Sequence, residues 1–290
     1  MTIQGLHHIT LVSANAQRTV DFYTRVLGQR FVKRTVNFDD PGSYHLYFGD
    51  EIGRPGSAIT FFEWPQAPKA RIGIGGTQHF ALKVNDLDSL LRWKRRLTDM
   101  GIAVQGPTTH DGYATIRFAD ADGVALQITT SGTATQADSW PTPVPTITGD
   151  MALLHGVHHL TTIARNLDRT DAFYRDLLGL ERAVEGVDPD DARNRERSWS
   201  ADGDRTRITV LEHKTGTPAR IGIGGTHHFA LAVADEATQL VWRDKLIEAG
   251  LQVTPVQNRV YFKSIYFSDP DGHIVEIATA GPGFAYDEPV

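Results

Sequence analysis

The chain has 290 residues, with 35 acidic against 29 basic side chains and a formal net charge of −6. This balance argues against a broad nucleic-acid surface. The absence of cysteine excludes disulfides, thiolate metal sites and cysteine nucleophiles. No apolar run reaches the length of a membrane span, and the residues after Met1 show no secretory pattern. We therefore expect a cytoplasmic protein without nucleic-acid or membrane partners.

The sequence is internally duplicated. RIGIGGTQHFALKV at 71–84 and RIGIGGTHHFALAV at 220–233 differ at only two positions, at an offset of 149. LHHIT at 6–10 matches VHHLT at 157–161. A fixed internal period of this kind indicates duplicated structural units. The segment 131–152 is rich in Ser, Thr, Gly and Pro, which predicts an extended linker between the halves.

Each half contains two copies of a smaller unit. A short strand with a histidine begins each copy, and a helical pattern of apolar residues follows it. Gly101 and Gly250 come directly after the second and fourth helical patterns, as C-terminal caps do. In chain order, the first strand and the helix of each unit are predicted at 6–12 and 16–27, at 78–84 and 87–100, at 157–163 and 167–178, and at 227–233 and 236–249.

Alternating apolar runs after each helix predict further strands. At 266–276, Asp-Pro-Asp-Gly turn chemistry between two strand-like runs predicts a hairpin. The overall pattern is therefore an α+β fold of four βαβββ modules. We expect one pair of modules in 1–130 and a second pair in 153–290.

These motifs resemble those of the vicinal oxygen chelate superfamily, which includes glyoxalases, bleomycin-resistance proteins and extradiol dioxygenases. The shared features are the histidine on the first strand of a unit, the FYxxxLG helix end, and DPDG followed by a glutamate. LHHIT, FDDPGSYHLYFGD at 38–50 and the four-unit length are similar in particular to hydroquinone-type ring-cleaving dioxygenases. The resemblance implies two paired-sheet, glyoxalase-like domains with one divalent metal on a concave sheet surface.

The resemblance implies His8, His228 and Glu276 as the metal ligands. Side chains alternate between the two faces of a strand, so only one member of each His-His pair is expected to face the cavity. We take the second member, because it recurs in all four copies whereas the first member varies. Two imidazoles and one carboxylate with adjacent open positions are typical of Fe(II) oxygenases, and Mn(II) suits nearly the same donors.

Further residues near the metal are implied by the same resemblance. Tyr266 would donate a hydrogen bond to a bound oxygen, and Arg259 would hold an anionic oxygen. Thr10 lies on the strand face of His8. His7 and His227 are expected to face the substrate or to move protons near neutral pH. A purely structural role stays open for each of these five residues.

The first half serves as an internal control for the metal site. Gln127 stands where the second half has Glu276. A neutral amide is a poor substitute for a carboxylate on a divalent ion, so we predict one metal per chain. His79 and His159 are then interpreted as buried, hydrogen-bonded strand residues.

The function that the resemblance implies is a ring-cleaving dioxygenase. Such an enzyme would use Fe(II) and O2 to open a small hydroquinone- or catechol-type aromatic diol, in aromatic degradation or quinone detoxification. A homo-oligomeric state is compatible with this assignment. Candidates for an apolar pocket wall, or for plain core, are Phe262, Phe229 and Trp64.

Two alternatives remain open at this point. A glyoxalase-type isomerase or lyase would need Glu63 as a fourth ligand around Ni(II) or Zn(II). Glu63 has the counterpart Glu212 in the other half and precedes Trp64-Pro65 at a strand end, so we expect it outside the cavity. The second alternative is a non-enzymatic resistance protein that binds an aromatic compound or drug, which a complete His, His, Glu set argues against.

Overall fold

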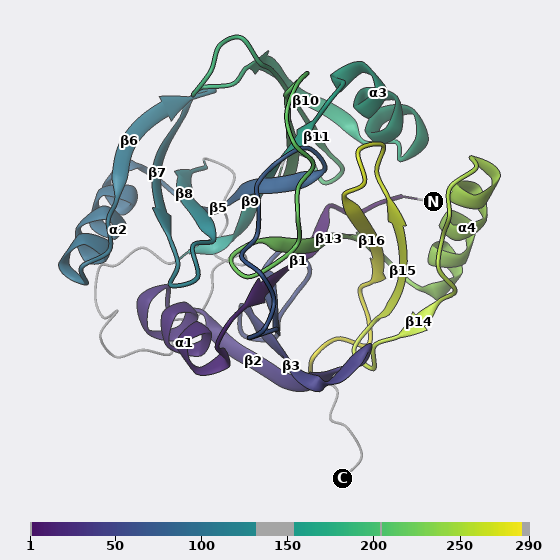
Figure 1. Ribbon diagram of the computed structural model, residues 1–290, viewed down its shortest axis with the longest axis horizontal. Coiled ribbons are helices and arrows are strands. Elements are labelled where there is room, and N and C mark those ends of the chain that lie inside the picture. The colour runs from purple at the N-terminus through teal and green to yellow at the C-terminus, as the bar shows by residue number, and fades with distance from the viewer. Residues whose placement is uncertain (1, 132–153, 204, 286–290) are drawn as a thin grey trace.

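The computed structural model describes residues 2–131, 154–203 and 205–285. This part of the chain contains two curled eight-stranded sheets with helices on their outer sides, which confirms the four predicted βαβββ modules (Figure 1). The predicted linker 131–152 lies outside the described residues apart from Ser131. No helix in the described ranges is long and apolar enough to span a membrane.

The modules follow one another along the chain. The first has β1 (Leu6–Ser13), α1 (Ala16–Asp21) continued by a π-helical turn (Phe22–Val26), β2 (Arg30–Asn37), β3 (Asp40–Gly49) and β4 (Ala58–Glu63). The second has β5 (Gly76–Val84), α2 (Leu87–Asp99), β6 (Gln105–His110), β7 (Tyr113–Ala119) and β8 (Ala125–Thr130). The third has β9 (His155–Ala164), α3 (Leu167–Asp171) continued by a π-helical turn (Ala172–Leu177), β10 (Glu181–Val187), β11 (Arg195–Ser200) and β12 (Arg207–Glu212). The fourth has β13 (Thr226–Val233), α4 (Glu236–Glu248), β14 (Gln257–Asn258), β15 (Lys263–Ser268) and β16 (Ile274–Thr279).

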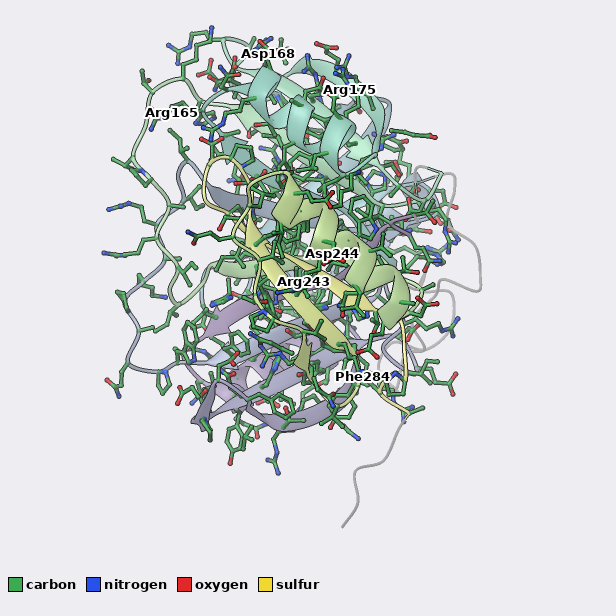
Figure 2. The ribbon with its side chains drawn as sticks, turned by 90° about the vertical axis from the view of Figure 1, so that its right-hand side faces the viewer. Arg165, Asp168, Arg175, Arg243, Asp244 and Phe284 are labelled. Carbon is green, nitrogen blue, oxygen red and sulfur yellow. The ribbon has the colours of Figure 1, made fainter. Side chains whose placement is uncertain are left out.

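Local capping fixes the ends of the helices. Each α-helix follows an Asn or Asp whose side chain accepts a hydrogen bond from a backbone N–H of the first turn. Gly101 and Gly250 have φ of +77° and +84°, which confirms the predicted C-terminal glycines. On α4, Trp242 and Leu246 are buried against the sheet, while Asp244 is exposed on the outer side of the helix (Figure 2).

Each sheet takes one module from each half of the sequence. The first sheet has the strand order β14-β15-β16-β13-β1-β4-β3-β2, so the fourth module joins the first. The second sheet has the order β10-β11-β12-β9-β5-β8-β7-β6 and joins the third module to the second. β1 and β13 pair antiparallel in the middle of the first sheet (Figure 1). This pairing places the beginning and the end of the chain in one site.

The first strand of every module carries a β-bulge. In β1, Leu6 pairs with Leu231 and His8 with Ala230, so His7 is the extra residue. His227 is the extra residue of β13, and Gln78 and His158 are the extra residues of β5 and β9. A bulge interrupts the regular alternation of side chains. Regular alternation would direct the first member of each pair to the sheet face opposite the second. Because of the bulge, the first member is not directed there.

Beyond the bulge, strand alternation separates the core from the cavity. Ile9 and Leu11 on β1 have no exposed surface and belong to the main hydrophobic core. The largest buried side chains of that core include Tyr23, Trp93, Tyr174 and Trp199.

The two RIGIGG segments explain the exact repeat seen in the sequence. They cross antiparallel, and Arg71 and Arg220 exchange two backbone hydrogen bonds of 3.0 Å each. A Cβ on Gly73 would lie 2.3 Å from the carbonyl oxygen of Thr217, and one on Gly222 would lie 2.2 Å from that of Pro68. Because glycine has no Cβ, these residues allow the two segments to approach each other this closely.

Substitution of Gly73 by Ala should therefore destabilise the fold. The methyl group would meet backbone rather than a movable side chain, and overpacking of this kind costs about 1–3 kcal/mol. Chemical denaturation should show a lower free energy of unfolding for Gly73→Ala. Gly186→Ala is the matched control, because no atom lies within 4 Å of the position that its Cβ would take. Equal stability of the two variants would contradict the role assigned to the crossing.

Candidate metal centre

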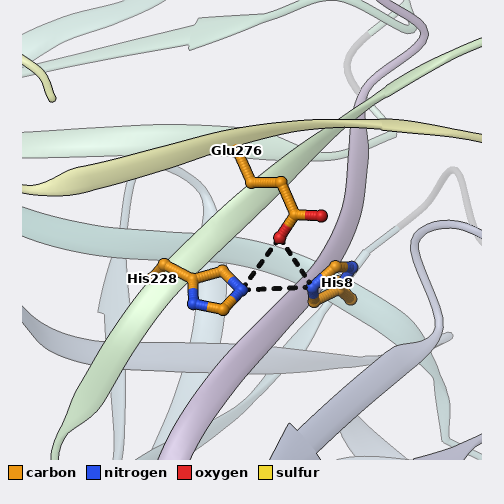
Figure 3. Close-up of side chains that lie close together, drawn as sticks. All are labelled: His8, His228 and Glu276. Carbon is orange, nitrogen blue, oxygen red and sulfur yellow. Dashed lines mark hydrogen bonds and ion pairs between the residues drawn. The ribbon is translucent and has the colours of Figure 1, made fainter. Parts of the chain in front are cut away.

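His8 on β1, His228 on β13 and Glu276 on β16 converge on one point (Figure 3). The Nε2 atoms of the two histidines lie 3.4 Å apart, and Oε2 of Glu276 lies 3.3 Å from His8 Nε2 and 2.9 Å from His228 Nε2. All three side chains are buried, and Glu276 has no exposed surface. Within the described ranges, this is the group of three His or acidic side chains whose donor atoms come close enough to share a metal.

The donor set fits a divalent cation. Burial lowers the pKa of His228 although Glu276 opposes the shift, so the imidazole is neutral near pH 7. Burial acts to raise the pKa of Glu276, but His8 and His228 hold it well below its ordinary value. Oε2 of Glu276 is buried and has no hydrogen-bond partner. A buried carboxylate oxygen without a partner is costly, and a cation bound between it and two imidazole lone pairs would remove that cost.

His7 and His227 orient the two imidazoles. Nδ1 of His7 lies 2.9 Å from Nδ1 of His8, and Nδ1 of His227 lies 2.8 Å from Nδ1 of His228. If Nε2 of His8 binds a metal, its Nδ1–H donates to His7, whose own Nε2–H then donates to the Thr279 carbonyl at 3.2 Å. The bulges at His7 and His227 make these contacts between neighbouring rings geometrically accessible.

The protonation states of His7 and His227 differ from those that the sequence led us to expect. Burial is the main cause that lowers the pKa of His7 and of His227 to about 3. Neither ring is therefore poised to gain a proton near neutral pH, as the unperturbed value of histidine had suggested. The neutral imidazoles act by their hydrogen-bond donors and acceptors.

Tyr266 and Arg259 lie at the mouth of the same cavity. Burial raises the pKa of Tyr266 well above its ordinary value, so its hydroxyl keeps its proton. Arg259 Nη2 lies 3.4 Å from this hydroxyl and donates to Asp39 Oδ2 at 2.7 Å. It also bonds to Gln257. The structure thus brings both predicted residues to the site and adds Asp39, which the sequence did not indicate.

A hydrogen-bonded chain lines the side of the cavity formed by β1, β4 and β3. The Oγ1 atoms of Thr10 and Thr60 lie 2.8 Å apart, and Thr60 Oγ1 lies 2.9 Å from His45 Nε2. The Tyr47 hydroxyl lies 2.7 Å from His45 Nδ1. His45 and Tyr47 line the cavity, whereas Thr10 and Thr60 do not and are fully buried. Alternation along β3 puts Ser43, His45 and Tyr47 on one strand face, but only the structure shows that this face lines the cavity.

The cavity above the three ligands is small. Its volume is about 10 Å³, which is close to the space of one water molecule. Phe38, from the segment between β2 and β3, forms part of the wall. The other lining residues are His8, Asn37, His45, Tyr47, Phe62, His228, Arg259, Phe262 and Tyr266. An aromatic ring can enter only if part of this wall moves.

Of the three predicted wall residues, one lies at the wall. Phe262 lines the cavity, while Trp64 stacks behind Phe62 with ring centroids 5.4 Å apart. Phe229 belongs to the hydrophobic core, because it occupies the other face of β13.

Glu63 lies outside the cavity, as predicted. Its Oε1 accepts the backbone N–H of Ala16 at 2.7 Å, at the start of α1. Glu212 accepts the backbone N–H of Leu167 at 3.0 Å in the equivalent place. Both glutamates therefore link the end of a strand to the start of a helix by a hydrogen bond. Glu63 does not join His8, His228 and Glu276 to form the four-ligand set of an isomerase.

The equivalent place in the second sheet differs from the expectation in one respect. Gln127 pairs with Ala81 as Glu276 pairs with Ala230, so Gln127 takes the position of the third ligand. His79 and His159 were predicted to be buried, but both are partly exposed and line a second cavity. They line it because they sit on the open inner face of the sheet rather than on its core face.

The chain belongs to the Glyoxalase/Bleomycin resistance protein/Dioxygenase superfamily, whose family model matches residues 5–128 and 156–277. It is 36% identical over 287 residues to MhqO of Bacillus subtilis (strain 168), whose name assigns it to the ring-cleaving dioxygenases; the match covers 98% of this chain and 87% of MhqO. It is 32% identical to chlorohydroquinone/hydroquinone 1,2-dioxygenase of Sphingobium indicum, with 99% and 88% covered. A crystal structure of a protein assigned as a dioxygenase, from Bacillus subtilis, superposes with a TM-score of 0.88 at 33% identity and covers 99% of this chain and 88% of that one. The resemblance inferred from the motifs is confirmed.

Replacement of His7 by Phe should weaken metal binding without removing a ligand. The variant loses the acceptor for the Nδ1–H of His8, and loss of such a partner typically costs 10- to 100-fold, roughly, in metal affinity. Competition with a chelator for Fe(II) or Mn(II) measures the change. His158→Phe, at the equivalent bulge of the second sheet, is the matched control and should keep the affinity. An unchanged affinity in His7→Phe would show that His7 does not orient His8.

Proposed function

We propose that this chain is an Fe(II)-dependent ring-cleaving dioxygenase that opens a hydroquinone- or catechol-type diol with O2. The observation that carries the proposal is the buried convergence of His8, His228 and Glu276, three donors that leave adjacent coordination positions free. The names of relatives at 32% and 36% identity over nearly the whole chain support the same reaction class. The geometry of Glu63 supports this proposal over a four-ligand isomerase.

The bound metal would supply adjacent sites for the diol and O2 and the electron-transfer chemistry between them. His8, His228 and Glu276 would hold it, with Ser264 Oγ donating to the second carboxylate oxygen of Glu276 at 2.5 Å. This hydrogen bond leaves Oε2 as the oxygen that faces the two imidazoles.

The surrounding residues would bind and orient the diol. Phe62 and Phe262 form apolar walls on which an aromatic ring can pack. The Arg259 guanidinium would hold an anionic oxygen of the substrate or of the acid product, and the Tyr266 hydroxyl would donate a hydrogen bond. His45, with its hydrogen bonds to Thr60 and Tyr47, is a further polar group at the ring. His227 would orient the ring of His228 through the contact between their Nδ1 atoms.

Anaerobic loading with Fe(II), followed by O2 uptake with hydroquinones and catechols, tests the function. Wild type should consume O2 and form a new absorbing ring-opened product. Glu276→Gln and His228→Ala should both fall to background, because the metal loses a ligand. Glu63→Gln is the matched control and should keep its activity, since the Glu63 side chain accepts from Ala16 at the start of α1 and does not line the cavity.

Two outcomes would contradict the proposal. Tight metal binding without O2 uptake on any diol would point to a reaction other than dioxygenation. Turnover of a thiohemiacetal by the Ni(II)-loaded chain, lost in Glu63→Gln with full retention of folding, would support the four-ligand isomerase instead.

Phe38 should limit the size of the substrate. It forms part of the cavity wall, and its ring lies 6.0 Å from the Arg259 guanidinium. Phe38→Ala should therefore raise kcat/KM for an alkyl-substituted hydroquinone relative to hydroquinone, by about tenfold. Tyr44→Ala is the control, an exposed aromatic of β3 that does not line the cavity. An unchanged preference in Phe38→Ala would exclude Phe38 as a size-limiting residue.

A further inference from the structure

A second cavity lies on the inner face of the β10–β6 sheet, at the place equivalent to the metal centre. Its volume is about 70 Å³, against about 10 Å³ at the metal centre. One water needs roughly 10–15 Å³, so the second cavity has room for a small organic molecule. Its lining includes His79, Gln127, His159, Glu196, Ser198 and Arg207.

The strand register shows how this cavity diverged from the metal centre. The ring centroids of His79 and His159 lie 5.7 Å apart at an interplanar angle of 80°, close to the 5.5 Å and 80° of His8 and His228. The third donor has become Gln127. The second cavity thus has the same pair of imidazoles as the metal centre, but it lacks the anionic ligand that a divalent cation requires. The second cavity is not built for a metal.

Both arginines that line the cavity are already paired with aspartates. Arg117 Nη1 donates to Asp190 at 2.5 and 2.7 Å, and Arg207 Nη1 donates to Asp111 at 2.8 Å. His110 lies 3.1 Å from the buried carboxylate of Glu196. An anionic ligand would have to compete with these aspartates for the two arginines. The lining therefore favours an uncharged ligand.

The floor of the cavity offers hydrogen-bonding groups that are not in use. Ser198 is a lining residue that is 1% exposed, and its buried Oγ has no hydrogen-bond partner. Nε of Arg117 is likewise buried and without a partner. Burial and the nearby Arg117 lower the pKa of His79 to about 3, so its ring is neutral. A neutral imidazole, an amide and a hydroxyl each donate and accept, which complements a hydroxyl group on a ligand.

We propose that this cavity is a second binding site, which takes a small uncharged hydroxylated molecule such as a single-ring diol. Ser198, Gln127, His79 and His159 hold its hydroxyl groups. The site needs no metal, so it exists independently of the dioxygenase activity proposed for the first sheet. In an enzyme that acts on diols, such a site would bind a second diol molecule without turnover.

Hydroquinone binding to the full-length chain, stripped of metal by a chelator and kept anaerobic, tests the proposal. Isothermal titration should detect binding to wild type. Ser198→Leu, which fills the cavity, should weaken that binding at least tenfold. Gln127→Met, which keeps the volume but removes the amide, should weaken it several-fold. Tyr44→Phe removes a hydroxyl that lies outside both cavities and should leave it unchanged.

Thermal unfolding establishes that each variant is folded. If Ser198→Leu fails to fold, Gln127→Met still tests the site. Benzoate serves as the anionic probe of similar size and should bind at least tenfold more weakly than hydroquinone. Three results would overturn the proposal. These are no hydroquinone binding, binding unchanged by both second-cavity substitutions, and tighter binding of benzoate. Because no turnover is measured, none of these results depends on the proposed dioxygenase activity.

Discussion

The structure depends on one buried carboxylate. Glu276 has no exposed surface, yet the two histidines beside it hold its pKa well below the ordinary value against the effect of burial. A charge in this position must be compensated, because the free energy of burying an isolated carboxylate is prohibitive. The histidines that face it, His8 and His228, come from β1 and β13. The pairing of the first module with the fourth is therefore a condition for the site, and the order of strands in the first sheet satisfies it.

The bulge at the start of the first and the fourth module also helps to position the histidines around Glu276. A regular strand would send His7 and His8 to opposite faces. The bulge instead lets neighbouring rings contact each other through Nδ1, and this contact fixes which nitrogen of His8 faces Glu276. The same bulges occur in the second sheet, where His158 and His159 make the same contact at 2.8 Å. The contact that orients the histidine thus belongs to both sheets of the duplicated fold, while the difference in metal binding predicted between the two sheets follows from the third ligand.

The inner faces of the two sheets differ in their side chains although they share the same strand arrangement. The second sheet keeps two imidazoles in nearly the same geometry but carries Gln127 for Glu276 and Ser198 for Tyr47. The smaller side chain at position 198 contributes to a larger cavity. The first sheet has aromatic side chains around the ligands and is closed by Phe38 and Arg259. One duplicated fold therefore presents two pockets of different size and polarity.

The sequence by itself determined the modules, their helices and the ligand candidates. Apolar periodicity, capping residues and the repeat are local signals, and they predicted α2 and α4 to within a residue at their ends. The Gln127 substitution was visible because the repeat supplied its own alignment. Only the tertiary structure placed His45, Tyr47 and Asp39 at the cavity, put Phe229 in the core, and gave His7 and His227 their low pKa values. The physical reason is that burial and contacts between strands distant in the chain set these properties, and no local pattern of residues encodes them.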